Sequence, residues 1–155
     1  MHRNNGIELV HLFDLTAALA PTIALGQGAR GERRMVPILA GVFEGKRLRG
    51  TLQAGGIDWQ MSRADGVTEI EAHYSLLTDD GALIRVINKG YRHGPSEVMQ
   101  RLALGEPVSP GEYYFRAAPI FEAPMGRYDW LNRSIFISTG ERSSNSVTLR
   151  FYEVL

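Results

Sequence analysis

The sequence contains no cysteine, and this absence removes several classes of protein at once. Disulfide-stabilised folds, thiolate zinc sites, iron–sulfur clusters and cysteine nucleophiles all need that side chain. An excess of charge of either sign is also missing, because 17 basic side chains balance 17 acidic ones. A protein that binds nucleic acid through a global positive field carries a surplus of Lys and Arg, so we expect no nucleic-acid partner.

Long apolar runs are absent as well. The most apolar stretch, residues 7–25, is interrupted by Glu8, His11, Asp14 and Pro21. A transmembrane helix needs about 20 nearly uninterrupted apolar residues, and the apolar part of a signal peptide carries no such charges. We therefore expect a cytoplasmic protein that has no membrane partner.

Glycine is the residue in excess, with 17 copies among 155 residues, and short alternating segments lie between the glycines. Apolar and polar residues alternate in them with the period of two that is typical of strands. The clearest pair, residues 67–77 and 82–89, flanks an Asp-Gly turn that favours a tight hairpin. The pattern predicts a helix over residues 95–104 and further strands over residues 7–15, 35–43, 47–53, 58–63, 112–122, 127–139 and 146–154.

No repeat, low-complexity linker or charge run marks a boundary, so residues 1–155 are predicted to form one domain. Eight to ten short antiparallel strands leave sheet edges that need protection, and closure into a barrel removes them. A barrel of about eight strands has an interior wide enough for a small ligand. The sequence therefore predicts a mainly β protein, a single antiparallel β-barrel with one short helix. A β-sandwich is the alternative architecture.

A glycine-rich segment, Gly26-Gln27-Gly28-Ala29-Arg30-Gly31, matches the dinucleotide-binding fingerprint letter for letter. That motif works only where its last glycine begins a helix whose N-terminal amides face the pyrophosphate. The residues that follow, 32–37, are strand-like and end in proline. We therefore interpret the motif as a flexible loop and expect no nucleotide cofactor.

Histidine and carboxylate side chains give only a weak indication of a metal site. Glu71 and His73 are two residues apart, so they project from one face of a strand. A catalytic zinc needs three protein ligands, and no second histidine pair with comparable spacing occurs. A solvent-facing polar strand explains the pair more simply, and we expect neither a metal nor any other cofactor.

Aromatic and charged side chains are interleaved in three short stretches, a composition typical of a barrel interior that holds a ligand. The first places Asp58 beside Trp59, directly after two glycines that permit close approach of the backbone. The second, residues 113–122, holds four aromatic residues, an arginine and a glutamate. The third sets Trp130 and Asn132 on one face of the following predicted strand.

Strand alternation also places Tyr114, Arg116 and Glu122 on one face. We predict that Asp58 is a carboxylate base and that Arg116 and Asn132 are its oxyanion partners, all three converging inside the barrel. The predicted substrate contacts are Trp59, Glu71, Tyr114, Glu122 and Trp130, of which Glu71 and Glu122 are alternative bases. A purely structural interpretation stays open, in which Arg116 pairs with Asp58 or Glu122 and the aromatic side chains form core.

A series of motifs resembles a known family of small, mainly microbial proteins. They are GERRMVPI (31–38), GVFEG (41–45), GGIDW (55–59), TDDGA (78–82), YFR (114–116) and WLNR (130–133), with Phe136 and Gly140. The family is uncharacterised protein family 0311 (domain of unknown function 3237), and the resemblance covers nearly the whole chain. Ala40 departs from it, because a second glycine is expected before Gly41. The resemblance implies a lipocalin-like antiparallel barrel and implies no reaction.

Three functions fit such an interior. The first is a cofactor-independent enzyme that isomerises, dehydrates or cyclises a small cyclic or aromatic substrate by proton transfer. The second is a protein that binds or carries a small molecule without changing it. The third is a structural protein that assembles through an exposed sheet or strand edge. In the first two cases the partner is a small molecule, and we also expect a homo-oligomer.

Overall fold

A computed structural model describes residues 6–155, so the first five residues of the predicted domain 1–155 lie outside the described residues. The strands in this range are β1 (Leu9–Leu19), β2 (Ile23–Gly28), β3 (Gly31–Glu44), β4 (Gly50–Leu52), β5 (Gly56–Ser62), β6 (Thr68–Thr78), β7 (Leu83–His93), β8 (Tyr114–Glu122), β9 (Ile135–Arg142) and β10 (Ser146–Val154). The helices are α1 (Ser96–Ala103) and the 3₁₀-helices η1 (Pro110–Glu112) and η2 (Asp129–Arg133).

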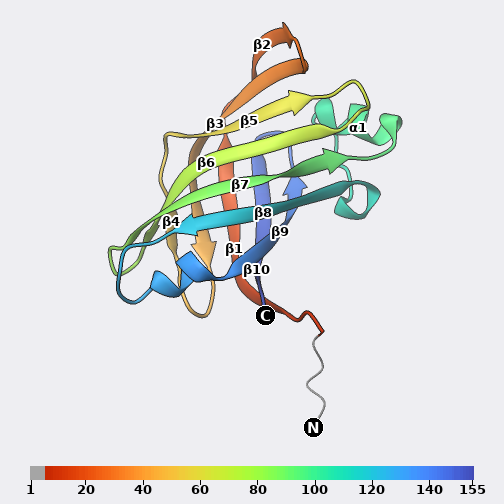
Figure 1. Cartoon of the computed structure of the whole chain (residues 1–155). Coiled ribbons are helices and arrows are strands. Elements are labelled where there is room, and N and C mark those ends of the chain that lie inside the picture. Colours follow the sequence, from red (N-terminus) through yellow and green to blue (C-terminus); the bar gives the residue numbers. More distant parts are fainter. Residues whose placement is uncertain (1–5) are drawn as a thin grey trace.

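The strands form an antiparallel sheet that closes on itself as an eight-stranded barrel (Figure 1). Around the barrel, β1 is followed by β10, β9, β8, β7 and β6, and the pairing of β3 with β1 closes the ring. Both β4 and β5 lie between β6 and β3 and together fill one position, because each pairs with a different half of those two strands. The prediction of a closed antiparallel barrel is confirmed, and the β-sandwich alternative is wrong.

Strand β2 lies outside the ring and projects from the top of Figure 1 as a hairpin with the first part of β3. Residues 26–31 form the turn and flanking strand ends of this hairpin. A strand begins at Gly31, where a dinucleotide site would need a helix. The loop interpretation of residues 26–31 therefore holds for the turn at residues 29–30, whereas residues 26–28 and Gly31 are strand.

The hairpin between β6 and β7 confirms the predicted Asp-Gly turn. Gly81 has a φ of +92°, a left-handed conformation that glycine adopts without steric cost. The backbone N–H of Gly81 donates to the Thr78 carbonyl at 3.0 Å, and that of Thr78 donates to the Ala82 carbonyl at 2.9 Å. These bonds fix the register of β6 and β7, which extend from the turn to the helix end of the barrel.

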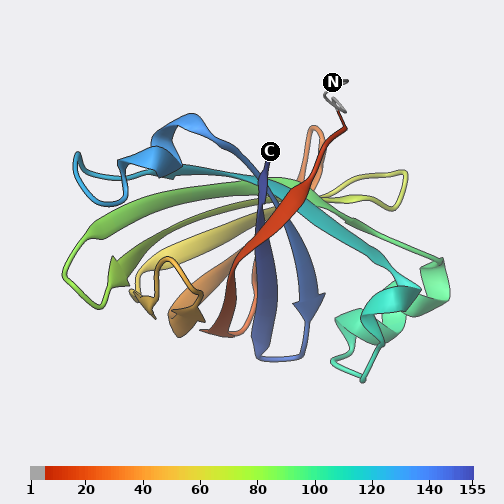
Figure 2. The same cartoon turned by 90° about the horizontal axis from the view of Figure 1, so that it is seen from below.

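The helix prediction is confirmed, and one strand prediction is wrong in part. Helix α1 follows β7 and lies on the opposite side of the barrel from η2 (Figure 2). Residues 127–139 do not form one strand, because η2 replaces its first half. The backbone N–H of Asp129 donates to the Gly126 carbonyl, and that of Leu131 donates to the Tyr128 carbonyl. These hydrogen bonds form a helical turn before β9 begins. Neither α1 nor any other described helix has the length and apolar character needed to cross a membrane.

The barrel interior has an aromatic half and a half lined by smaller side chains. Near the β6–β7 turn, Phe13 packs against Phe151 and Phe43 at ring-centroid distances of 4.5 and 5.2 Å. Phe121 packs edge-on against Phe136 at 4.9 Å in the same cluster. Toward α1 the small inward residues Ala72, Ala117 and Ser138 alternate with larger ones such as Tyr74 and Phe115. The small residues leave space for polar groups in the half of the barrel that faces α1.

Candidate functional site: a polar chamber at the α1 end

Two adjoining cavities occupy the α1 half of the barrel. An inner chamber of about 40 Å³ lies among the strands, and a vestibule of about 480 Å³ lies between the strand ends and α1. Arg92 and Arg142 line both cavities, so the two spaces meet at these side chains. The chamber has room for a water molecule or a small substituent, whereas the vestibule has the volume of a metabolite site.

Asp58 supplies the carboxylate of the inner chamber. Across the sheet, Asp58 on β5 lies opposite Ala72 on β6, and Ala72 lies opposite Asn88 on β7. The small Ala72 side chain therefore separates the Asp58 carboxylate from the Asn88 amide. Oδ2 of Asp58 accepts a 2.8 Å hydrogen bond from Nε2 of Gln60. Oδ1 is buried and accepts no hydrogen bond from the described residues. This oxygen is therefore free to take part in chemistry inside the chamber.

Burial raises the pKa of Asp58 above its ordinary value, because the interior solvates a carboxylate poorly. The Gln60 hydrogen bond and the charges of Arg92, Arg142 and Arg34 act in the opposite direction and offset the shift in part. A carboxyl group whose pKa moves from the acidic range toward neutrality becomes a stronger base when it is ionised.

Three arginines surround the meeting point of chamber and vestibule. Arg92 lies near the end of β7 and is 9% exposed, and its guanidinium stands 5.5 Å above the Phe115 ring. Burial lowers the pKa of Arg92 to about 10, and repulsion from Arg142 adds to this effect. Burial likewise lowers the pKa of Arg142, at the end of β9. Arg34 on β3 completes the group and donates from Nη2 to Oγ of Ser62 at 2.8 Å.

Uncharged polar groups complete the chamber. The Tyr74 hydroxyl is buried and makes no hydrogen bond of normal geometry with the described residues, although the Asn88 amide lies beside it. Burial and the nearby Asp58 charge raise its pKa, and the Asn88 amide offsets this shift only in part, so the phenol stays protonated and can donate. The Asn88 amide and the Ser138 hydroxyl lie within 3.4 Å of each other across the barrel. The chamber thus combines one carboxylate, one phenol and guanidinium groups.

The predicted convergence of Asp58, Arg116 and Asn132 is wrong. On β8 the inward side chains are those of Phe115 and Ala117, so Arg116 points outward, where Nη1 donates to the Phe115 carbonyl at 2.9 Å. Asn132 lies in η2 and is exposed. Its amide bonds both the N–H and the carbonyl of Ala123, at 2.7 and 2.9 Å. It therefore fixes the loop after β8 and does not reach the chamber.

Two predicted substrate contacts, Trp59 and Glu71, also lie outside the barrel. Trp59 follows the inward Asp58 and faces an outer groove, which Glu71 lines as well. Glu71 pairs with His73 at 2.8 Å and with Lys89 at 3.3 Å. These bonds lower the pKa of Glu71, the His73 hydrogen bond most, so this carboxylate is a surface ion pair and not an alternative interior base.

The remaining predicted contacts are on the outer surface or at the far end. Tyr114 is exposed on β8, and Glu122 is exposed and pairs with Arg85 at 3.3 Å. Trp130 is half-buried in η2, where the guanidinium of Arg47 stacks 3.5 Å above its ring. The alternative pairing of Arg116 with Asp58 or Glu122 is not present either. In the described chain, neither carboxylate lies within ion-pair distance of the Arg116 guanidinium.

Sequence reasoning missed the arginines, although one available signal pointed to Arg92. The strand predicted over residues 82–89 already has Val86 and Asn88 on one face, and that face continues to residue 92 if the strand does. Strand β7 indeed runs to His93. Arg34 and Arg142 carried no comparable signal, because a charged residue near a strand end ordinarily faces solvent.

The fold and the interior together define a class: a small closed antiparallel β-barrel with a polar chamber at one end. The chain belongs to the family described as protein of unknown function (DUF3237), whose model matches residues 7–154. A UPF0311 protein of Rhodopseudomonas palustris is 38% identical over 149 residues, which cover 96% of this chain and 97% of the relative. The resemblance seen in the sequence motifs is therefore confirmed.

Solved structures show the same barrel. A conserved protein of unknown function from Rhodopseudomonas palustris is 36% identical with a TM-score of 0.94, covering 98% of this chain and 100% of its own. A β-barrel-like protein from Acinetobacter baumannii is 38% identical with a TM-score of 0.86 over the full length of both chains. An enzyme from Penicillium herquei is 21% identical with a TM-score of 0.73, covering 100% of this chain and 99% of its own. This last likeness shows the fold alone.

Proposed function

We propose that the protein is a cofactor-independent enzyme that binds a small organic molecule at the α1 end of the barrel and transfers a proton with Asp58. The observation that carries this proposal is the free, buried Oδ1 of Asp58 in a chamber that also holds a guanidinium and a phenol. Buried polar atoms without partners are rare in folded proteins because each costs free energy. A ligand that reaches them supplies the missing interactions.

The chamber has the two elements that proton abstraction next to a carbonyl group requires. Oδ1 of Asp58 takes the proton as the C–H bond breaks, and the electron pair moves onto the carbonyl oxygen. Arg92 and the Tyr74 hydroxyl face that oxygen in this arrangement and stabilise the enolate that forms. Return of the proton to another atom gives isomerisation, and loss of a neighbouring hydroxide gives dehydration. A cyclisation follows if the enolate carbon attacks an electrophilic carbon of the same molecule, whose displaced electron pair then takes up the proton from Asp58.

The sizes of the two cavities indicate which part of a substrate each one would hold. The inner chamber accepts a carbonyl-sized group, and the vestibule accepts the rest of a small cyclic or aromatic compound. The upward shift of the Asp58 pKa by burial suits this role, because it makes the ionised carboxylate a stronger base.

The test is deuterium exchange at C–H groups next to carbonyls, followed by proton NMR in D₂O for a panel of small cyclic and aromatic ketones. Asp58→Asn is expected to reduce the enzyme-dependent exchange rate by about 10²–10⁴-fold, the usual contribution of a positioned base. Glu122→Gln is the matched control, because it also removes one carboxylate but on the exposed surface. Equal rates in the wild type and Asp58→Asn would refute the role of Asp58.

A second function, ligand binding without reaction, is favoured by the same free polar atoms, since they need a ligand and not a reaction. Native mass spectrometry of protein purified from its own host tests for a retained small molecule. A retained molecule that returns unchanged, together with no exchange for any ketone of the panel, would favour the carrier over the enzyme. In that case Asp58→Asn alters affinity alone.

A further inference from the structure

The arginines at the barrel mouth combine burial with a lack of acidic partners. On the surface Arg49 pairs with Asp79 at 3.1 Å, and Arg101 pairs with Glu112 at 2.9 Å. Within the described chain, no carboxylate oxygen lies within ion-pair distance of Arg34, Arg92 or Arg142. Other arginines without an ion pair, such as Arg33, lie on the outer surface, whereas Arg92 and Arg142 lie where the interior cavity meets the vestibule.

Their N–H groups are also largely without acceptors. A guanidinium carries five N–H donors and no acceptor. Nε of Arg34 and Nε of Arg92 are buried and donate to no described atom. The Arg142 side chain makes no hydrogen bond within residues 6–155, although its backbone N–H donates to the Tyr113 hydroxyl at 2.9 Å. Leaving a buried donor unpaired costs about 1–3 kcal/mol, so this arrangement is poorly satisfied by the protein itself.

The charge balance points the same way. Three guanidinium groups face the single carboxylate of Asp58, and burial already disfavours the ionised form of that carboxylate. Arg92 and Arg142 also repel each other, which contributes to the lowered pKa of Arg92. An anion between these side chains would supply acceptors and compensate the excess positive charge at the same time.

The vestibule favours a carboxylate over a phosphate. The wall of the vestibule includes Met99, Leu102 and Ala103 of helix α1, and Leu104 and Gly105, which directly follow it. The carboxyl end of a helix carries partial negative charge, in contrast to the amino end that commonly binds phosphate. A dianion is therefore opposed by the same helix end that provides apolar contacts. A monoanion with an apolar body fits both the arginines and this wall.

We propose that Arg34 and Arg142 bind the carboxylate group of a small organic acid in the vestibule, next to the chamber that holds Asp58. The inference deepens the proposed function and rests on it for one point, namely that the bound acid is the molecule presented to Asp58. The binding step itself does not need Asp58. Arg34 and Arg142 come from β3 and β9, on either side of the mouth, so a carboxylate between them fixes one end of the molecule.

The experiment is isothermal titration calorimetry of the full chain with benzoate, phenylacetate and indole-3-acetate, each compared with its neutral primary amide, and with phenyl phosphate. At least one carboxylate is expected to bind tenfold or more tightly than its amide and than phenyl phosphate. Arg34→Gln and Arg142→Gln should each weaken that binding by about tenfold or more, the size expected for loss of a charge-assisted bond. Arg142→Lys should give an intermediate loss of affinity, because lysine keeps the positive charge but lacks the planar guanidinium that binds a carboxylate through two parallel hydrogen bonds.

Arg33→Gln is the matched control. Arg33 neighbours Arg34 on β3, lines the outer groove instead of the vestibule and loses the same charge on substitution. Its carboxylate affinity should equal that of the wild type, and thermal unfolding shows whether each variant is folded. The proposal is overturned if no carboxylate binds more tightly than its amide, if phenyl phosphate binds most tightly, or if Arg33→Gln weakens binding as much as Arg142→Gln.

Asp58→Asn separates this inference from the proposed function. It should retain or strengthen carboxylate binding, because a negative charge near the anion is removed, while proton exchange is lost. Intact carboxylate binding with unchanged exchange would leave the arginine site standing and refute the base. Lost exchange in Asp58→Asn with carboxylate affinity unaffected by Arg34→Gln and Arg142→Gln would refute the arginine site and leave the base standing.

Discussion

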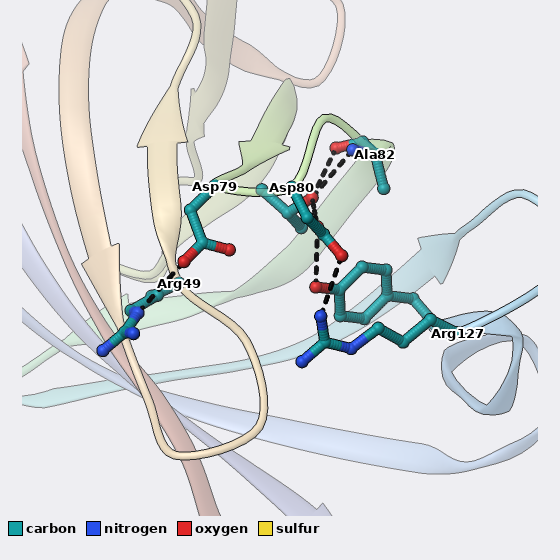
Figure 3. Close-up of polar contacts among 7 residues, drawn as sticks. Arg49, Asp79, Asp80, Ala82 and Arg127 are labelled. Atoms are coloured by element: carbon teal, nitrogen blue, oxygen red, sulfur yellow. Dashed lines mark hydrogen bonds and ion pairs between the residues drawn. The ribbon is translucent and has the colours of Figure 1, made fainter.

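The two ends of the barrel place charged side chains in opposite environments. At the end away from α1, Asp80 accepts hydrogen bonds from the Tyr128 hydroxyl at 2.8 Å, from Arg127 at 2.9 Å and from Oγ1 of Thr78 at 2.6 Å, as Figure 3 shows for the labelled residues. Arg49 and Asp79 pair beside it (Figure 3). At the α1 end, Asp58 and three arginines are more deeply placed and make few bonds with the protein.

This difference separates charges that are paired within the fold from charges that, in our proposal, bind a ligand. The Asp80 cluster ties the β6–β7 turn to the loop before η2, and solvent reduces the energy of each ion pair there. A cavity of about 820 Å³ lies over this cluster, yet most charged side chains in its walls are paired, among them Arg49, Asp79 and Asp80. Cavity size therefore identifies the α1 end less well than unpaired buried polar atoms do.

The interior packing differs between the ends in the same sense. Phe13 is fully buried and contacts Phe43, Phe121 and Phe151, whereas the lining near Asp58 mixes apolar side chains with polar ones and leaves a cavity. The aromatic end therefore supplies stability, and the α1 end holds polar atoms at some expense of stability, as expected where a site is built for a ligand.

Phe13→Ala is expected to have the largest effect on stability. Removing a fully buried phenylalanine costs about 3–5 kcal/mol, which corresponds to a fall in melting temperature of roughly 10 °C for a chain of this length. Asn88→Ala in the polar half should cost only about 1 kcal/mol, because it removes a long amide–hydroxyl contact. Thermal unfolding by circular dichroism measures both. Equal losses would mean that the two halves are packed equally well.

The architecture was predictable because its determinants are local. Strict alternation and an Asp-Gly turn fixed the β6–β7 hairpin, and good helix formers between Pro95 and Gly105 marked α1. The last strand was predicted over residues 146–154, the bounds that β10 has. Closure followed from the need to protect strand edges. None of these inferences required knowing which strand face points inward.

The site was less predictable because it depends on that choice of face. In β8 both faces carry apolar residues, with Phe115 and Ala117 inward and Tyr114 and Ile120 outward, so the pattern did not reveal that Arg116 points to solvent. Asp58 was identified, and its interior position agrees with the prediction. Arg92 is buried, although arginine side chains ordinarily face water. Such conflicts between the sequence pattern and the structure are expected at functional sites.

Arg92→Met should stabilise the fold while it removes function. The guanidinium is nearly buried and has an unpaired Nε, and burial lowers its pKa to about 10. Replacing it with an apolar side chain of similar length is expected to raise the free energy of unfolding by about 1–3 kcal/mol. Chemical denaturation measures this gain, and the deuterium-exchange assay should show loss of activity. A destabilised Arg92→Met would mean that Arg92 acts as a structural partner of Asp58.

Tyr128→Phe tests the opposite end, where a polar contact is expected to stabilise. Tyr128 is 3% exposed, and its hydroxyl donates to the Asp80 carboxylate. Loss of this bond should lower the free energy of unfolding by about 1–2 kcal/mol without changing ligand binding. Tyr152→Phe serves as the control, because the Tyr152 hydroxyl makes no hydrogen bond within the described chain. Indistinguishable stabilities of the two variants would show that the Asp80 cluster is not a structural contact.

The smallest effect, a change of stability with pH, has opposite signs at the two ends. Burial raises the pKa of Asp58, so its contribution to stability is complete below its unfolded value of about 3.8 and is lost as the pH rises through the folded value. The hydrogen bonds from Thr78, Tyr128 and Arg127 lower the pKa of Asp80, that of Thr78 most. The contribution of Asp80 to stability is therefore present above its unfolded pKa of about 3.8 and is lost as the pH falls through the folded value.

From pH 4 upward, wild type should therefore lose stability relative to Asp58→Asn. From pH 4 downward, it should lose stability relative to Asp80→Asn. Denaturation of the three proteins at several pH values measures both differences. If wild type instead gained stability relative to Asp58→Asn with rising pH, the arginines would outweigh burial, and Asp58 would be an ion-pair partner in a structural cluster like that of Asp80.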